Sequence, residues 1–120
     1  MILAMNVNEK FFALRKGMLE FLVLQIIAAE KVYAADILKQ LNATEFATQE
    51  GTLYPLLTRL KNADMLTYRW VESNSGPPRK YFSLTEKGLA FYRELETTWK
   101  ELADAVDALA NKTEKISDNP

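Results

Sequence analysis

The sequence of 120 residues contains no cysteine and no histidine. The lack of cysteine excludes disulfide bonds and thiolate nucleophiles, and the lack of both residues excludes the common zinc, copper and haem ligand sets. The lack of histidine also removes the side chain best suited to proton transfer near neutral pH and the base of Ser-His-Asp catalysis. We therefore expect a binding protein that uses no metal and no cofactor.

Glycine is also scarce, with four residues, and the sequence has no glycine-rich loop of the kind that cradles phosphates. Asp104 and Asp107 lie one helical turn apart, as a catalytic pair of carboxylates could. A solvated helix face explains such a spacing far more often than catalysis does. The sequence therefore does not predict an enzyme.

Long hydrophobic runs are missing as well. The most apolar window, Met18 to Ala29, is 12 residues long and is interrupted by Glu20 and Gln25. A helix needs about 20 apolar residues to span a bilayer. The first five residues lack the basic and apolar regions of a signal peptide. We expect a soluble, cytoplasmic protein that does not associate with membranes.

The net charge is −1, from 15 basic and 16 acidic residues, whereas compact nucleic-acid binders are often strongly basic. The charges are unevenly distributed. Residues 1–84 carry ten basic and eight acidic groups, and residues 85–120 carry five and eight. Within residues 59–80 there are five basic groups and two acidic ones. A local basic patch on a neutral chain fits a small nucleic-acid footprint whose acidic counterweight lies elsewhere.

Apolar residues at a helical spacing predict a first helix over residues 9–29 and a second over about 33–42. The first helix is apolar almost all the way round, so it must be covered on more than one side. Either it runs through the middle of the fold, or a second subunit covers it.

A third helix is predicted to run to about Ala63, with leucines spaced by three and four residues and Thr48 as its N-cap. Pro55 falls inside this helix. Because proline lacks a backbone N–H, we expect it either to kink the helix or to move its start toward Thr52.

The hydrophobic period then changes to two. Residues 66–72 and 79–84 alternate as strands do, and Asn74-Ser75-Gly76-Pro77-Pro78 between them is a strong turn signal. A hairpin alone is marginal in water, so it should pack on the helices. We interpret its aromatic residues as packing groups: Tyr68, Trp70, Tyr81 and Phe82.

A fourth helix is predicted from Thr85, its N-cap, and a polar, disordered tail from Lys112. The helix carries an a/d stripe that is too short for an independent coiled coil but is suited to docking on another apolar helix. This stripe, the predicted dimer interface, consists of Tyr92, Leu95, Trp99, Leu102, Val106 and Leu109.

Three helices followed by a hairpin are typical of a winged helix-turn-helix, in which the third helix enters the major groove and the hairpin reaches the adjacent backbone or minor groove. The predicted fold is mainly α with a β-hairpin and a long C-terminal helix. Other α+β arrangements share this order of elements.

Two stretches are more specific. TLYPLLTRL at 52–60 followed by GPPRKYFSLTEKG at 76–88 strongly resembles the PadR family of bacterial transcriptional regulators, and the match runs from about Arg15 to Trp99. The sequence departs from the family at 33–36, where many members have Tyr-Gly-Tyr-Asp/Glu and this chain has Tyr-Ala-Ala-Asp. The departure puts the packing of the second helix, and any contact made there, in doubt.

The resemblance implies a homodimeric repressor that binds double-stranded DNA and is often released by small phenolic or aromatic compounds. On this interpretation residues 1–84 form a winged helix-turn-helix DNA-binding domain. Residues 85–120 form the C-terminal dimerisation helix and the polar tail.

Hydroxyl, amide and cationic groups on the outer face of the third helix and on the hairpin can read base edges or hold phosphates. An ordinary solvated face fits the same helix equally well, and the family resemblance decides between them. The predicted DNA-binding residues are Gln49, Thr52, Tyr54, Pro55, Thr58, Arg59, Lys61, Asn74, Ser75, Gly76, Arg79 and Lys80.

Trp99 has two interpretations, as an interface anchor or also as the wall of a flat cavity for an aromatic effector near the two-fold axis. The predicted effector-binding residues are Trp99, Leu95, Ala103, Val106, Phe12, Leu14 and Phe21.

Two functional hypotheses remain. The first is a dimeric regulator that reads an inverted repeat with two helices about 34 Å apart. The second is a winged-helix protein-interaction module without DNA function. The net charge slightly favours the second hypothesis, whereas the motif match and the adjacent Arg79 and Lys80 favour the first.

Overall fold

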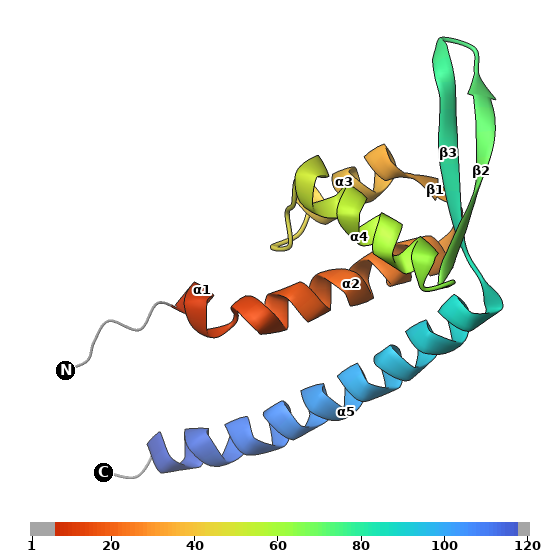
Figure 1. Ribbon diagram of the computed structural model, residues 1–120. Helices are drawn as coiled ribbons and strands as arrows, with labels where there is room; N and C mark the ends of the chain where they lie inside the picture. The colour runs from red at the N-terminus through yellow and green to blue at the C-terminus, as the bar shows by residue number, and fades with distance from the viewer. Residues whose placement is uncertain (1–6, 118–120) are drawn as a thin grey trace.

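The computed structural model describes the backbone of residues 7–117 and the side chains of residues 9–112. It confirms the predicted architecture, which is mainly helical with a β-hairpin wing and a long C-terminal helix (Figure 1). The elements in chain order are α1 (Val7–Lys10), α2 (Phe12–Ala29), β1 (Val32–Tyr33), α3 (Ala34–Asn42), α4 (Glu50–Asn62), β2 (Leu66–Ser73), β3 (Gly76–Leu84) and α5 (Glu86–Ser117).

The C-terminal half of α2 lies at the centre of the core. In Figure 1, α3 and α4 lie on one side of α2 and α5 runs along the other. This explains why α2 is apolar almost all the way round, as its sequence required. The buried core residues are Val23, Leu24, Ile27, Val32, Ile37, Leu41, Leu53, Leu56, Leu57, Leu60, Leu66 and Phe82.

The sheet has three antiparallel strands in the order β1-β3-β2. Strand β1 pairs only through Val32 and Tyr33, which lie opposite Phe82 and Tyr81 of β3. A strand of two residues has no detectable period, so no hydrophobic pattern predicted it. Its pairing holds the entry to α3 against the base of the wing, which we define as β2, β3 and the turn between them.

The wing turn is shorter than predicted. The turn residues are Asn74 and Ser75, and the Gly-Pro-Pro segment that follows belongs to β3. The pairing of β2 with β3 shifts register between Val71 and Ser73, opposite the two prolines, and β1 covers β3 only near its C-terminal end, so neither proline has a ladder partner that needs its missing N–H. The prediction of a five-residue turn was therefore wrong.

The predicted helix over 9–29 is interrupted. Phe11, with φ −103° and ψ 14°, separates α1 from α2. The last helix is longer than predicted, because no proline or glycine between Lys112 and Ser117 stops α5 before its end at Ser117. The predicted disorder from Lys112 was thus wrong as far as Ser117, and residues 118–120 lie outside the described residues.

Helix α4 begins at Glu50 with Gln49 as its N-cap. Thr48 is therefore not the cap, and its backbone N–H donates a hydrogen bond of 3.1 Å to the Asn42 side chain at the end of α3. The helix continues through Pro55, so its start is not displaced toward Thr52. Early in a helix, a missing N–H removes one hydrogen bond that the leucine packing of the same segment can offset.

Helix α4 ends in a Schellman motif. The N–H of Asp64 donates to the Lys61 carbonyl at 3.0 Å, and the N–H of Met65 donates to the Leu60 carbonyl at 2.9 Å. Asp64 occupies the left-handed position with φ 66°, where glycine is the usual residue.

Helix α5 begins against this same turn. The Thr85 hydroxyl donates to the Asp64 carbonyl at 2.5 Å, and the Thr85 N–H donates to the Met65 carbonyl at 3.1 Å. The Lys87 ammonium donates to the Ala63 carbonyl at 2.9 Å. We call these contacts the α4–α5 joint. They attach the first turn of α5 directly to the last turn of α4.

Thr85 is the N-cap of α5, as predicted. Its hydroxyl oxygen accepts a 2.9 Å hydrogen bond from the N–H of Gly88. Between residues 7 and 117, no helix is long and apolar enough to cross a membrane.

Candidate nucleic-acid interface

The twelve residues predicted to bind DNA are all exposed. They lie on the outer face of α4, at the tip of the wing and on β3. The inner face of α4 is held in the core by four leucines, which fixes the outward direction of the opposite face. The position of this face follows from the leucine spacing alone.

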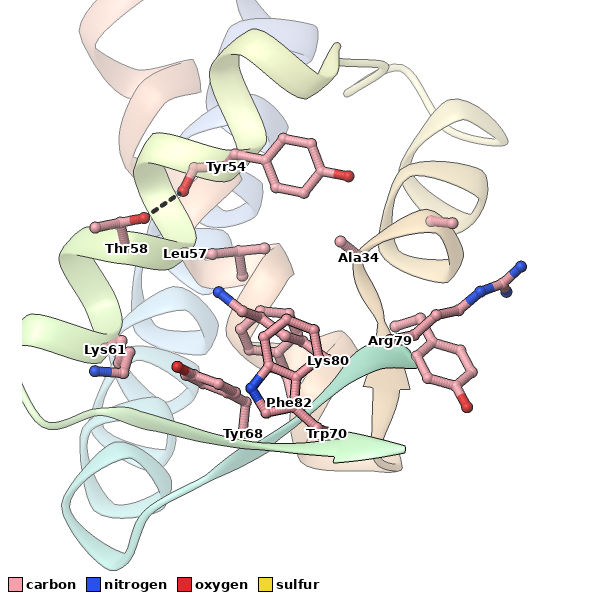
Figure 2. Close-up of a pocket in the computed structure, with 12 residues that line it drawn as sticks. Ala34, Tyr54, Leu57, Thr58, Lys61, Tyr68, Trp70, Arg79, Lys80 and Phe82 are labelled. Carbon is pink, nitrogen blue, oxygen red and sulfur yellow. Dashed lines mark hydrogen bonds between the residues drawn. The ribbon is translucent and has the colours of Figure 1, made fainter. Parts of the chain in front are cut away.

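Two of the outward residues interact with each other. The Thr58 hydroxyl donates a hydrogen bond of 3.0 Å to the Tyr54 carbonyl one turn earlier (Figure 2). This leaves the lone pairs of the Thr58 oxygen and its methyl group for an external partner. A base amino group and a thymine methyl are suitable partners for such a side chain.

A cavity of about 610 Å³ separates α4 from the wing (Figure 2). It brings together Tyr54, Thr58 and Lys61 of α4 with Arg79 and Lys80 of β3. Five of the twelve predicted residues therefore meet at one concave site. The other residues of its lining are Tyr33, Ala34, Ala35, Leu57, Tyr68, Trp70 and Phe82.

The cations at this cavity lie against aromatic rings. The Lys80 nitrogen is 4.6 Å from the centroid of Tyr68 and 5.4 Å from that of Trp70. The Lys61 nitrogen is 5.6 Å from the Tyr68 centroid. Within the described part of the chain, neither lysine forms an ion pair, so both charges are available to an external anion.

The remaining predicted residues lie outside the cavity. Asn74, Ser75 and Gly76 form the tip of the wing. Gln49, Pro55 and Arg59 lie elsewhere on the exposed surface of α4, and Thr52 lines a different groove between α4 and the start of α2.

That second groove contains two cations that the sequence analysis did not select. Arg15 and Lys16 of α2 line it together with Thr52. The Arg15 guanidinium donates to the Glu45 carbonyl at 2.9 Å and lies 4.9 Å from the centroid of Phe46. The signal that could have identified these two cations was their adjacent position on an otherwise apolar helix. Their closeness to α4 depends on the tertiary fold and could not be predicted from the sequence.

Trp70 was predicted to pack within the fold, but it is largely exposed. Its side chain is 62% exposed, although its ring meets Tyr68 edge-on at 6.1 Å. The wing extends beyond the helices (Figure 1), so only its base has a helical surface to pack on. The alternation of residues predicts which face of a strand points inward. It does not predict how far along the strand the helices continue to cover that face.

The predicted effector residues do not all meet. Leu14 and Phe21 of α2 line a groove of about 250 Å³ with Leu95 and Trp99 of α5. Ala103 and Val106 lie farther along α5, and Phe12 lines the groove beside Arg15 instead. Trp99 is 44% exposed and Leu102, the next a/d residue, is 54% exposed. The stripe on α5 is therefore uncovered along much of its length.

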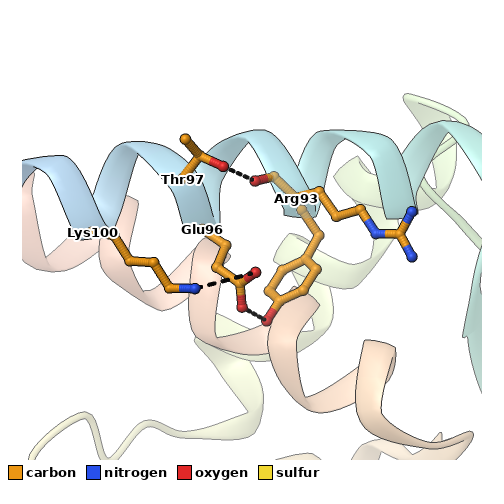
Figure 3. Close-up of polar contacts among 5 residues, drawn as sticks. Arg93, Glu96, Thr97 and Lys100 are labelled. Carbon is orange, nitrogen blue, oxygen red and sulfur yellow. Dashed lines mark hydrogen bonds and ion pairs between the residues drawn. The ribbon is translucent and has the colours of Figure 1, made fainter.

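Near its first turns, α5 is fastened to α2. The ring of Tyr92 stacks on Phe21 with centroids 5.8 Å apart, and its hydroxyl donates to a Glu96 carboxylate oxygen at 3.0 Å. Lys100 lies 4.0 Å from the same carboxylate, and the Thr97 hydroxyl donates to the Arg93 carbonyl at 3.1 Å (Figure 3).

Burial raises the pKa of the Tyr92 hydroxyl above its usual value of 10.0, and the hydrogen bond and negative charge of Glu96 raise it further. A hydrogen bond with Gln25 acts in the opposite direction. The neutral phenol is therefore the form that this contact stabilises.

Comparisons with known proteins agree with this geometry. The sequence matches the model of the transcriptional regulator PadR-like family over residues 23–94. A PadR-like transcription factor from Bacteroides fragilis, known from an X-ray structure, is 50% identical in sequence, with a TM-score of 0.72 over 84% of this chain and 98% of that one. A PadR-like transcriptional regulator from Bacillus cereus is 34% identical, with a TM-score of 0.75 over 82% and 96% of the two chains.

A PadR family regulator from Eggerthella lenta is 36% identical, with a TM-score of 0.73 over 87% of this chain and 91% of that one. In sequence, an uncharacterised protein of Lysinibacillus sphaericus is 28% identical over 95 residues, which are 77% of this chain and 87% of that protein.

The family model covers more than half of the chain, and its members are transcriptional regulators, not enzymes. PadR-like regulators bind DNA, which favours the first of the two hypotheses over an interaction module without DNA function. This chain belongs to the PadR-like family of transcriptional regulators, and it is a DNA-binding regulator.

Proposed function

We propose that this protein is a homodimeric repressor that reads an inverted repeat, with α4 as the reading helix of each subunit and the wing as a phosphate clamp. The observation that carries the proposal is the meeting of α4 and β3 around one cationic, aromatic cavity, with Thr58 and Tyr54 facing the same space as Lys80 and with Arg79 at its edge beside Tyr33. Residues 1–84 act as the DNA-binding domain.

The two parts of this surface have different roles. Thr52, Tyr54 and Thr58 offer hydroxyl groups on a helix that fits the major groove, so they set sequence preference. Arg79 and Lys80 are flexible cations on a strand, so they hold phosphates without regard to sequence.

The dimer is supported by the apolar surface that one subunit leaves uncovered. Trp99, Leu102 and Val106 of α5 are exposed, and so are Phe12 and Leu14 at the start of α2. Contiguous apolar patches of this kind mark interaction sites. A second copy placing its own α2 and α5 there, related by a two-fold axis, would bury both stripes. Residues 85–120 act as the dimerisation segment.

We further propose that a flat aromatic effector binds against Trp99 near the two-fold axis. The α2–α5 groove already places Leu95, Phe21 and Leu14 around this ring, and no charged residue lines it. Ala103 and Val106, farther along α5, and Phe12 of α2 would complete the site only through contacts with the partner copy. Such a ligand would shift the equilibrium between the DNA-binding arrangement of the dimer and another arrangement. The size of the shift is set by how much more tightly the ligand binds one arrangement than the other.

The α4–α5 joint supplies the connection between that site and DNA. Because Thr85 and Lys87 are bonded to the carbonyls at the end of α4, a tilt of α5 at Trp99 moves the reading helix as well as the wing strand that leads into α5. A coupling of about 1–3 kcal/mol is typical of such transitions.

The proposal is tested by measuring affinity for DNA from upstream of the protein's own gene and for a scrambled fragment of equal length and composition, at several salt concentrations. We expect tighter binding to the upstream fragment, and affinities for both fragments that fall as salt rises. Equal affinity for the two fragments at every salt concentration would contradict sequence reading by α4.

A further inference from the structure

We propose that Arg15 and Lys16 of α2 form a second phosphate clamp, which holds the DNA strand on the side of α4 away from the wing. This inference rests on the proposed function and adds to it a contact surface on α2 that no sequence pattern predicted. It is carried by the arrangement of side chains round α4, by the charge of the groove between α2 and α4, and by the contacts of Arg15.

Helix α4 presents two rows of side chains, one on each side of its outward face. Tyr54 and Lys61 are seven residues apart, or about two turns, so they lie in one row, which lines the wing cavity. Thr52 precedes Tyr54 by two residues, which places it about 200° round the helix axis. Thr52 and Arg59, also seven residues apart, form the second row. Because the buried leucines occupy the inner face, the two rows flank the exposed one.

A helix in the major groove lies between two DNA backbones. The groove is about 12 Å wide, which is close to the diameter of a helix with its side chains, so both flanks of the helix approach phosphates. The wing cations are proposed to hold the backbone on the side of Tyr54 and Lys61. The row of Thr52 and Arg59 would then face the opposite backbone, where further cations are needed to hold α4 from both sides.

The groove between α2 and α4 supplies those cations. Arg15 and Lys16 line it together with Thr52, and its volume is about 330 Å³. No aspartate or glutamate lines the groove, and within residues 9–112 no carboxylate forms an ion pair with either cation. In Figure 1, the start of α2 lies toward the N-terminal end of α4, whereas the wing lies beyond its C-terminal end. A phosphate at the groove would therefore meet uncompensated positive charge far from the wing.

Arg15 is already oriented by contacts within the fold. Its guanidinium donates to the Glu45 carbonyl at 2.9 Å and lies 4.9 Å from the centroid of Phe46. These contacts restrict the side chain and leave further N–H donors of its planar fork for a phosphate. Binding through a restricted side chain costs less conformational entropy than binding through a free one.

Lys16 provides the sharper test of the clamp. Arg15 attaches the α3–α4 turn, residues 43–49, to α2, so its replacement would also disturb the position of α4. Lys16 is exposed and forms no hydrogen bond, ion pair or ring contact with the described residues. A loss of DNA affinity on replacing Lys16 would therefore report a lost external contact.

The first experiment measures the salt dependence of binding to DNA from upstream of the protein's own gene. Lys16→Gln should weaken binding about tenfold per subunit and lower the salt slope by about one per subunit, because one phosphate contact is lost. Lys31→Gln removes the same charge just after the other end of α2, outside the wing cavity and the Arg15 groove, and should change neither quantity. Equal salt slopes for the two variants would overturn the clamp.

Sedimentation of Lys16→Gln provides the structural control. Its dimerisation should equal that of the unaltered protein. Weaker dimerisation would overturn the assignment, because Lys16 would then act at the subunit interface and not on DNA.

The second experiment locates the phosphates by ethylation interference on the same DNA. With the unaltered protein, interfering phosphates should border both sides of the major groove in each half-site. Lys16→Gln should lose interference on one backbone, and Lys80→Gln should lose it on the other. A general loss of stability or of helix position would not produce this division. Loss of interference at the same phosphates in both variants would overturn the proposal.

Failure of the clamp and failure of the proposed function give different results. Equal affinity of the unaltered protein for upstream and scrambled DNA would contradict the proposed function and, with it, the clamp that rests on it. An intact preference for upstream DNA, together with identical binding by Lys16→Gln and Lys31→Gln, would overturn the second clamp alone.

Discussion

The α4–wing cavity and the α2–α5 groove both expose large aromatic or aliphatic side chains, but the residues around them differ. Three cations accompany the rings at the cavity, whereas the groove around Trp99 is lined by apolar and small residues only. A polyanion can be held at the first site and not at the second. The groove instead suits an apolar helix, which a second copy would supply in the proposed dimer.

This difference explains why the net charge of −1 is a poor guide to the protein. The basic excess of residues 59–80 covers the end of α4 and most of the wing, and the acidic excess lies in residues 85–120 on α5. An acidic α5 would repel DNA from the surface that is proposed to pair with another subunit. Local charge, not the total, decides what each surface binds.

The largest effect is expected from placing a charge on the α5 stripe. Leu102→Glu should weaken dimerisation about a hundredfold, or about 3 kcal/mol, because the carboxylate would be buried without a partner. Sedimentation at several protein concentrations measures the effect. Ala108→Glu adds the same charge on another exposed face of α5 and should leave the dimer intact. Equal behaviour of the two variants would mean that the stripe is not the interface.

The next effect concerns the joint that links the two surfaces. A Cβ added at Gly88 would lie 2.0 Å from the Met65 carbonyl oxygen. Gly88→Ala should lower the free energy of unfolding by about 1–3 kcal/mol, because backbone must move to make room. Chemical denaturation checks this value.

Gly51→Ala is the matched control, since a Cβ there meets nothing within 4 Å. Its stability should be unchanged or raised by up to about 1 kcal/mol. If both variants were equally stable, α5 would not be held against the end of α4 as closely as described.

A smaller effect separates reading from clamping at the cavity. Thr58→Val removes a hydroxyl and keeps the shape, so it should cost about 1 kcal/mol on the preferred DNA sequence and little on others. Arg79→Ala should weaken binding to all sequences alike and lower the salt slope by about one. Competition binding with matched and scrambled DNA tests both variants. An equal loss of specificity from both would contradict the two roles.

The smallest effect is a pH dependence at the α2–α5 contact. Because the pKa of Tyr92 is higher in the folded protein than its usual value of 10.0, the unfolded chain loses this proton first as pH rises. The stabilisation is present in full below pH 10.0 and is lost as the pH rises through the folded pKa. Unfolding curves of Tyr92→Phe should therefore depend less on alkaline pH than those of the unaltered protein.

The helices and the hairpin were predictable because each has a hydrophobic period that its own sequence displays. The leucines of α4 and the alternation around Phe82 fixed which faces point inward. The two-residue strand β1 and the short wing turn were not predictable, since both depend on where β3 has a neighbour to pair with.

The candidate site was predictable only in part, for a related reason. Sequence patterns placed Tyr54 and Thr58 on the outward face of a helix and Lys80 on the wing, but they did not show that α4 and β3 face each other across a cavity. Trp70 was misinterpreted because its exposure follows from the length of the wing relative to the helices. Arg15 is separated from Thr52 by 37 positions, and only the fold brings them to one groove.

The central claim is that a dimer held by α5 presents two copies of α4 to successive major grooves. Hydroxyl-radical footprinting of upstream DNA, with the unaltered protein and with Leu102→Glu side by side, tests it most directly. We expect two protected patches related by two-fold symmetry and centred about one helical turn, or 34 Å, apart, and we expect both to be lost with Leu102→Glu at the same concentration. A single patch with the unaltered protein, or an unchanged double footprint with monomeric Leu102→Glu, would contradict the account.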